Sequence, residues 1–296
     1  MHVGGISLSQ KVVFSASQIS SITVPVDKVR HISAVLSVRL WVSDYWGQLL
    51  QVDSSGRVLH DILRVEYSSF PFKFECTGSH TVTEDGDLLL IDDDKVRKLT
   101  SDGTVITLLT QDWGAPCIHS SRINGDILVG SISKVTRYNR TGRKLQVIEK
   151  DDKGHSLYRS PIYITENKNG DIWISDLDKG AVVVVDKSGR HRFDYGGRQS
   201  DYTDRQSDYT GRQFPFSPRG ICKDVLGHVL VCDFYNNSVH LLDQDGQFLS
   251  LLLTREQHGI HLPTALCVDD QHNLYLGQCD SNTINVYKYL KDTDFK

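Results

Sequence analysis

The sequence predicts an all-β fold, a six-bladed β-propeller in which each blade is a sheet of four short antiparallel strands. A short apolar segment that ends with a small or polar residue occurs six times in the chain. The starts of successive segments are 48, 39, 45, 57 and 45 residues apart. No stretch combines a sustained 3.6-residue apolar period with helix caps, so few helices are expected. The six segments begin at Leu40, Leu88, Ile127, Ile172, Val229 and Leu274.

Glycines at fixed offsets mark the turns between the predicted strands. Four of them stand two positions before an apolar segment, and five others stand seven positions after the start of the next strand, where a tight turn needs positive φ. The first set is Gly86, Gly125, Gly170 and Gly227, and the second is Gly56, Gly103, Gly142, Gly189 and Gly246. Each unit therefore reads as four strands in roughly 40 to 48 residues, the pattern of a propeller blade. The expected blades are 31–63, 79–110, 116–149, 161–195, 218–253 and 263–290.

The last unit is one strand short. Lys291 occupies the position of the expected turn glycine, and only five residues follow it. We expect a strand within residues 11–24, either Val12–Phe14 or Ile19–Val24, to complete the last blade. This closure would remove an open sheet edge and tie down both chain ends, so residues 1–296 would form a single propeller domain.

One spacing is longer than the others because a seven-residue unit is written twice. Residues 198–211 read RQSDYTD and then RQSDYTG, and removing these 14 residues from the spacing of 57 leaves 43. The sequence therefore predicts an inserted surface loop at 196–213, between the fourth and fifth blades. An alternative is a partner-specific arm that presents Tyr202 and Tyr209.

Composition restricts the classes of partner. The net charge of −4 argues against a generally basic surface, though not against a local basic patch. No apolar run reaches the ~18 residues of a membrane helix, and no secretory signal is visible, so a cytoplasmic protein with no membrane partner is expected. The six cysteines lie at least ten positions apart, which excludes a CxxC pair and the usual paired-ligand zinc site.

The fifth unit carries the clearest family motif. Residues 233–246, DFYNNSVHLLDQDG, resemble the NHL-repeat signature, and Pro161, Pro218 and Pro263 resemble its proline-led entry. Weaker copies run from about residue 31 to the end, with departures at Val38, where glycine is expected, and Ser131, where aspartate is expected. The chain is thus similar to the C-terminal propeller of tripartite-motif proteins.

This resemblance implies a non-catalytic protein-interaction propeller, a substrate-recognition or scaffold module related to tripartite-motif ubiquitin ligases. Those ligases also carry a RING finger, B-boxes and a coiled coil. The sequence shows no closely spaced Cys/His ligand sets and no heptads, so we expect either a fragment of such a protein or a free-standing propeller. Any ligase activity would need a RING finger from elsewhere.

The predicted ligand-binding face combines aromatic, basic and amide residues. In a propeller, the loops between second and third strands share one face with the connections between blades. Aromatic residues and arginines there are typical anchors of protein interfaces, although packing against a neighbouring blade is the alternative for each aromatic. The expected contact residues are Tyr45, Trp46, Arg159, Lys179, Arg219, Phe234, Tyr235 and Asn236.

Catalytic and cofactor motifs are not evident. The sequence has no GxSxG, HExxH, Walker or GxGxxG motif, so we expect no enzyme activity, no cofactor and no metal. The pair His258 and His261 is interpreted as part of a solvated loop. The aspartates that end the second strands are expected to accept backbone N–H bonds in the next loop; they are Asp44, Asp92, Asp176 and Asp233.

Two alternatives to protein binding remain open. RNA could bind the same face through residues such as Arg219, although acidic residues of the second and fourth blades interrupt the basic ones. A calcium-dependent lactonase or lyase would instead use ligands that converge at one mouth of the pore. Its candidate ligands are Asn236, Asn237 and Asp280.

Overall fold

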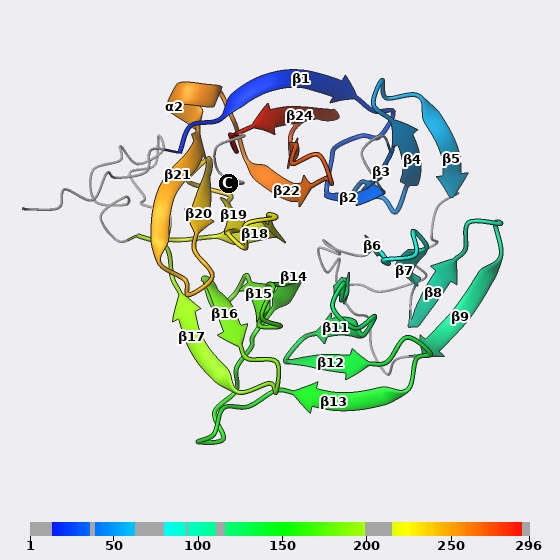
Figure 1. The fold of residues 1–296 in the computed structure, drawn as a ribbon, viewed down its shortest axis with the longest axis vertical. Coiled ribbons are helices and arrows are strands. Elements are labelled where there is room, and N and C mark those ends of the chain that lie inside the picture. Colours follow the sequence, from blue (N-terminus) through cyan, green and yellow to red (C-terminus); the bar gives the residue numbers. More distant parts are fainter. Residues whose placement is uncertain are drawn as a thin grey trace, which may run out of the picture.

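A computed structural model describes residues 14–35, 39–62, 80–92, 94–110, 116–198 and 215–291. Within these ranges the chain forms 24 strands in six four-stranded antiparallel sheets, arranged as a ring (Figure 1). The predicted six-bladed propeller is therefore confirmed. None of the helices in the described ranges is both long and apolar enough to cross a membrane.

In the first three blades the strands run from the centre of the ring outwards in chain order. Blade one contains β2 (His31–Val35), β3 (Arg39–Ser43), β4 (Leu49–Asp53) and β5 (Val58–Ile62). Blade two contains β6 (His80–Val82), β7 (Leu88–Asp92), β8 (Lys95–Leu99) and β9 (Val105–Thr110). Blade three contains β10 (Cys117–Ser120), β11 (Ile127–Ser131), β12 (Lys134–Tyr138) and β13 (Lys144–Ile148).

The next two blades repeat this order, and the sixth blade departs from it. Blade four contains β14 (Pro161–Glu166), β15 (Ile172–Asp176), β16 (Ala181–Val185) and β17 (His191–Tyr195). Blade five contains β18 (Pro218–Lys223), β19 (Val229–Asp233), β20 (Ser238–Leu242) and β21 (Phe248–Thr254). Blade six takes β22 (Pro263–Val268), β23 (Leu274–Gln278) and β24 (Thr283–Lys288) from the end of the chain and β1 (Ser17–Thr23) from its beginning.

The N-terminal strand closes the ring as predicted. Strand β1 pairs antiparallel with β24, with Thr23 opposite Thr283 and Ser17 opposite Lys288, and Figure 1 shows the two strands side by side. Of the two expected segments, Ile19–Val24 overlaps this strand, whereas Val12 and Val13 lie outside the described residues.

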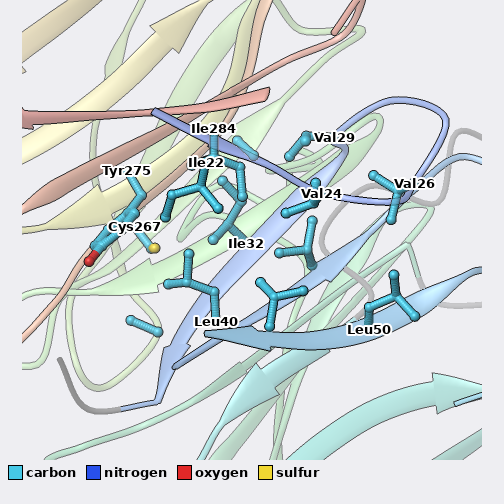
Figure 2. Close-up of a cluster of buried hydrophobic side chains, with 14 of the residues drawn as sticks. Ile22, Val24, Val26, Val29, Ile32, Leu40, Leu50, Cys267, Tyr275 and Ile284 are labelled. Carbon is cyan, nitrogen blue, oxygen red and sulfur yellow. The ribbon is translucent and has the colours of Figure 1, made fainter. Parts of the chain in front are cut away.

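A continuous apolar core seals the junction between blades six and one (Figure 2). Ile22 of β1 and Val24 just after it pack with Ile32 and Leu40 of blade one and Ile284 of blade six, and all five side chains are buried. Closure therefore rests on apolar burial from both ends of the chain as well as on strand pairing.

The periodic turn glycines provide the positive φ of each turn, and most of them also leave room for the neighbouring blade to pack closely. The five between third and fourth strands all have φ between 82° and 85°. At Gly142 a side chain would overlap with the Leu108 carbonyl of blade two, and at Gly246 it would overlap with the Phe193 ring of blade four. Gly103 has the same φ, but a methyl group there would meet no atom within 4 Å. Most of these turns therefore press directly against the outer strand of the preceding blade.

Strand direction divides the ring into two faces. We call the face that carries the second-to-third-strand turns and the blade connections the upper face, and the opposite one the lower face. One connection contains the short helix α2 (Arg255–His258). The Thr254 side chain caps its start by accepting a hydrogen bond from the Gln257 N–H, and Gly259, with φ 65°, ends it.

Candidate ligand-binding face

Three of the predicted aromatic contact residues are exposed on the upper face. Trp46, Tyr235 and Tyr45 expose 58%, 44% and 37% of their surface. Phe234 exposes only 7%, and Arg219 only 4% because it lies on the inner strand β18. The structure therefore places Tyr45, Trp46 and Tyr235 where a ligand could reach them, and Phe234 and Arg219 beneath the surface.

Carboxylates at the ends of second strands fix the loops that carry these residues. Asp44 accepts backbone N–H bonds from Trp46 (2.8 Å) and Gln48 (3.0 Å). Asp233 accepts from the Ser217 N–H (3.1 Å) and from the Asn236 side-chain amide. Asp44 therefore has the predicted role, whereas Asp233 takes its backbone bond from the connection that precedes the blade and holds the next loop through the Asn236 side chain.

Blade four confirms this role again, and blade two differs. Asp176 accepts from the backbone N–H groups of Arg159 (2.7 Å), Ser160 (2.9 Å) and Lys179 (3.0 Å). Burial raises the pKa of Asp176, and hydrogen bonds from these three donors partly offset the rise. Asp92 instead forms an ion pair with Arg97 at 2.6 Å.

Blade six connects the two groups of exposed aromatic residues. The Tyr45 hydroxyl lies 3.4 Å from the Cys279 sulfur, which joins blade one to blade six. The Asn237 side chain accepts a bond from the Leu262 N–H at 2.8 Å, which joins blade five to the same region. Between them, His261 Nδ1 lies 2.6 Å from an Asp280 carboxylate oxygen. We call the set Tyr45, Trp46, Tyr235, His261 and Asp280 the aromatic patch.

The sequence does not predict the last two members of the aromatic patch as part of a binding face. It suggests a solvated loop for His261 and only a calcium-ligand role for Asp280. Both are partly exposed, with side-chain exposures of 42% and 46%. Their sequence neighbourhood carries no aromatic residue that would mark it, because the patch forms only when three blades meet.

The predicted basic residues are used in other ways. The Arg219 guanidinium lies 4.8 Å from the centre of the Phe234 ring. Lys179 forms an ion pair with Asp194 at 2.8 Å and donates to the Leu157 carbonyl at 2.9 Å. Arg159 is exposed on blade four and is not among the contacts that link blades five, six and one.

Side chains from opposite blades meet in the centre of the ring below this face. The Tyr163 hydroxyl of blade four donates to the Arg30 carbonyl at the entry to blade one, and its ring stacks on His31 with centres 5.2 Å apart. Ser33 lies 3.1 Å from His80 Nδ1. Burial lowers the pKa of His31 to about 3 and also lowers the pKa of His80, so both rings are neutral.

The candidate calcium ligands are engaged in separate contacts. Asn236 donates to Asp233, Asn237 accepts from Leu262, and Asp280 bonds His261. In the part of the chain that the structure describes, no three His, Cys, Asp or Glu side chains are grouped so that they could hold a metal ion. Each of the three candidate ligands is thus bound to a different neighbour. Tyr202 and Tyr209 of the inserted loop lie outside the described residues.

Comparison with known proteins identifies the fold. No protein-family model and no curated protein matches the sequence. Among solved structures, a putative gluconolactonase superposes with a TM-score of 0.65 at 12% identity, covering 93% of this chain and 92% of its own. Virginiamycin B lyase from Staphylococcus aureus gives 0.60 at 12% identity, covering 94% and 100%. The WD40 propeller of Doa1 gives 0.61 at 11% identity, covering 94% and 98%.

These neighbours include two kinds of enzyme and one WD40 domain, all at identities that carry only the architecture. The NHL resemblance remains a likeness of the quoted motifs, since no family model supports it. The comparisons show that the chain is a β-propeller.

Proposed function

We propose that the protein is a non-catalytic interaction module that binds a protein ligand through the aromatic patch. The observation that supports this proposal is the exposure of Tyr45, Trp46 and Tyr235 on one face, around the His261–Asp280 pair. Large aromatic side chains are the residues that most often anchor protein interfaces, because each buries much apolar area on contact.

The two aromatic residues of blade one are also held in place before any ligand arrives. The Trp46 indole N–H donates to Asp27 at 3.3 Å, while its backbone N–H is bound by Asp44. The Tyr45 side chain is held at two points. The Arg30 guanidinium carbon lies 3.2 Å from the centre of its ring, and the Cys279 sulfur lies 3.4 Å from its hydroxyl. Side chains that are already ordered lose little entropy on binding, which favours affinity.

The resemblance to tripartite-motif propellers supports a more specific partner class. In that case the ligand is a substrate or a scaffold partner of a ubiquitin ligase, and the chemistry of ubiquitin transfer belongs to a RING finger. The localisation expected for such a module is cytoplasmic.

Peptide display against the purified protein would test the proposed face. Peptides selected on the wild-type protein should lose at least about tenfold in affinity for the double variant Trp46→Ala and Tyr235→Ala, since each anchor contributes about 1–2 kcal/mol or more. The matched control is Ile132→Ala, which removes an exposed side chain from the turn of blade three. Equal affinities for wild type and the double variant would reject this face.

A second candidate function is acid–base catalysis at the aromatic patch. The specific observation is an accessible histidine whose Nδ1 is held by a carboxylate, which leaves Nε2 available to take or give a proton. Hydrolysis of glucono-δ-lactone that His261→Ala abolishes, with unchanged melting temperature, would support it. Activity that is absent or independent of His261 would contradict it.

The RNA alternative has no such observation in its favour on this face. Arg219, its main candidate contact, is buried against Phe234, and Lys179 is paired with Asp194.

A further inference from the structure

The lower face carries a concentration of positive charge on blades three and four. Six exposed cationic side chains lie on or next to the turns at this end of the two blades. None of the six side chains forms a hydrogen bond or an ion pair with any residue that the structure describes. We call this set the basic sector: Arg122, Arg140, Arg143, Lys144, Lys168 and Lys187.

The carboxylates of the same turns are neutralised by other arginines. Asp126 pairs with Arg137 at 3.5 Å, and Asp186 pairs with Arg190 at 2.9 Å. Asp171 pairs with Arg192, which also pairs with Asp245 of blade five at 3.1 Å. Glu166, which ends β14, accepts a bond from the Ser121 hydroxyl. None of these ion pairs uses a cation of the basic sector, so the sector is a local excess of positive charge on a chain whose net charge is −4.

Contacts between the two blades make the basic sector continuous. The Gln146 side chain of β13 donates to the Ser188 carbonyl at 2.6 Å, which brings the start of the outer strand of blade three next to the turn that holds Lys187. The Lys168 stem lies against Gly227 of blade five, near the centre of the ring. There, burial lowers the pKa of Lys223; the charge of Glu166 opposes this shift, and the charges of Arg122 and Lys168 add to it.

Aliphatic side chains accompany the cations. Ile123, next to Arg122 at a turn tip, exposes 51% of its surface, and Leu145, next to Lys144, exposes 45%. Val147 exposes 37%. Exposed tyrosine and tryptophan side chains, which stack on nucleic-acid bases, occur among the described residues only on the upper face. Cations mixed with exposed aliphatic groups fit an anionic lipid surface better than a nucleic acid.

We propose that the basic sector docks the propeller on an anionic phospholipid bilayer. Clusters of four to eight Lys and Arg are sufficient for attraction to anionic headgroups, and exposed aliphatic side chains can enter the boundary between headgroups and acyl chains. The turns of blade two carry carboxylates at Glu84, Asp85 and Asp102 on the same face. Their repulsion from the bilayer tilts the ring so that blades three and four make the contact.

This contact differs in kind from a membrane span. The expectation of no membrane partner depends on the lack of a long apolar run in the sequence. A peripheral contact needs no such run, because its attraction comes from charges on separate turns that the fold assembles.

Co-sedimentation with vesicles would test the proposal. The full chain should bind vesicles of phosphatidylcholine with about 30% phosphatidylserine, should not bind phosphatidylcholine alone, and should be released as salt rises to about 0.5 M. Each cation near the surface contributes about fivefold in affinity. The variant Arg140→Glu with Lys187→Glu should therefore lose at least about 25-fold.

The matched control places the same charge change on the upper side of the ring. Lys28→Glu with Arg255→Glu alters the net charge equally, and both side chains are exposed in blade connections. This control should retain most vesicle binding. Ile123→Ser, which keeps all cations, should weaken vesicle binding by a few-fold, whereas binding to a polyanion without acyl chains should be unaffected.

Three outcomes would overturn the proposal. The first is no binding to phosphatidylserine vesicles at low salt, and the second is equal loss in the basic-sector variant and the upper-side control. The third is binding of an RNA oligonucleotide or polyglutamate through the basic sector without binding of vesicles, which would assign the surface to a different polyanion. None of these outcomes would affect the aromatic patch, since it lies on the other face.

Discussion

The Tyr163 hydroxyl donates a hydrogen bond to the backbone carbonyl of Arg30, a residue 133 positions earlier in the chain. Tyr163 belongs to β14 of blade four, and Arg30 stands at the entry to blade one, on the opposite side of the ring. The same tyrosine ring stacks on His31, with an angle of 8° between the two planes. Opposite blades are therefore coupled directly across the centre as well as through their neighbours.

We predict that substitutions at Tyr163 can separate the energy of its hydrogen bond from the energy of its ring stacking. Tyr163→Phe keeps the stacked ring but leaves the buried Arg30 carbonyl without this donor, and should lower the free energy of unfolding by about 1–2 kcal/mol. Tyr163→Ala also removes the ring and should cost about 3–5 kcal/mol. Urea denaturation would measure both values. The control is Tyr158→Phe, because the buried Tyr158 hydroxyl has no hydrogen-bond partner among the described residues. Equal effects at the two tyrosines would refute the assigned contact.

The turn glycines offer a test of how blades pack against each other. Gly142 and Gly103 occupy equivalent turns, with φ of 83° and 85°, but only Gly142 faces a neighbouring backbone carbonyl, that of Leu108. Gly103→Ala should cost about 1–2 kcal/mol, the strain of a left-handed residue with a side chain. Gly142→Ala should cost at least about 1 kcal/mol more, because backbone must move to admit the methyl group. Thermal and urea unfolding would show whether this difference exists.

The period of the fold is readable from the sequence because it rests on local chemistry. A tight turn requires positive φ, which favours glycine, so Gly56, Gly103 and Gly246 mark the same point in each blade. The missing outer strand is also predictable, because Lys291 stands where a turn glycine is expected. These features depend on residues close together in the chain.

The candidate site is only partly predictable, because local sequence patterns do not show which residues of different blades come close together in the fold. The sequence predicts Arg219 on the surface, yet it lies on the inner strand, where its guanidinium packs on the Phe234 ring. The link between Tyr45 and Cys279 spans 234 positions. The basic sector is likewise hidden in the sequence, since its cations come from separate turns whose neighbouring carboxylates are paired with other arginines.

Ring closure by β1 predicts a strong effect of N-terminal truncation. Deleting residues 1–25 removes β1, leaves the edge of β24 unpaired and takes Ile22 and Val24 out of the core shared with blade one. Burial of these two side chains alone contributes about 3–6 kcal/mol, so the melting temperature should fall sharply. Differential scanning calorimetry would measure it. Deletion of residues 1–13, which leaves β1 intact, provides the control, and similar melting curves for the two truncations would contradict closure by this strand.

Three histidines near the centre of the ring predict that the protein loses stability in acid. Burial lowers the pKa of His31 and His119 to about 3, with Lys223 and Arg122 adding to the effect at His119, and burial also lowers the pKa of His80. Each would titrate near 6.5 in the unfolded chain. Below pH 6.5 the unfolded state therefore binds protons that the native state does not, and the free energy of unfolding falls as pH falls.

The expected slope is about 1.4 kcal/mol per pH unit for His31 and for His119 between pH 6 and 4, where the unfolded chain is protonated at these residues and the native state is not. Urea denaturation at successive pH values would measure it, and His119→Gln should reduce the slope by about that amount. His60→Gln is the control, because His60 is exposed on the outer strand of blade one. A slope that His60→Gln and His119→Gln change equally would mean that burial of His119 does not control the acid response. A slope that only His119→Gln changes would tie the acid response to the side chains that fill the centre of the ring.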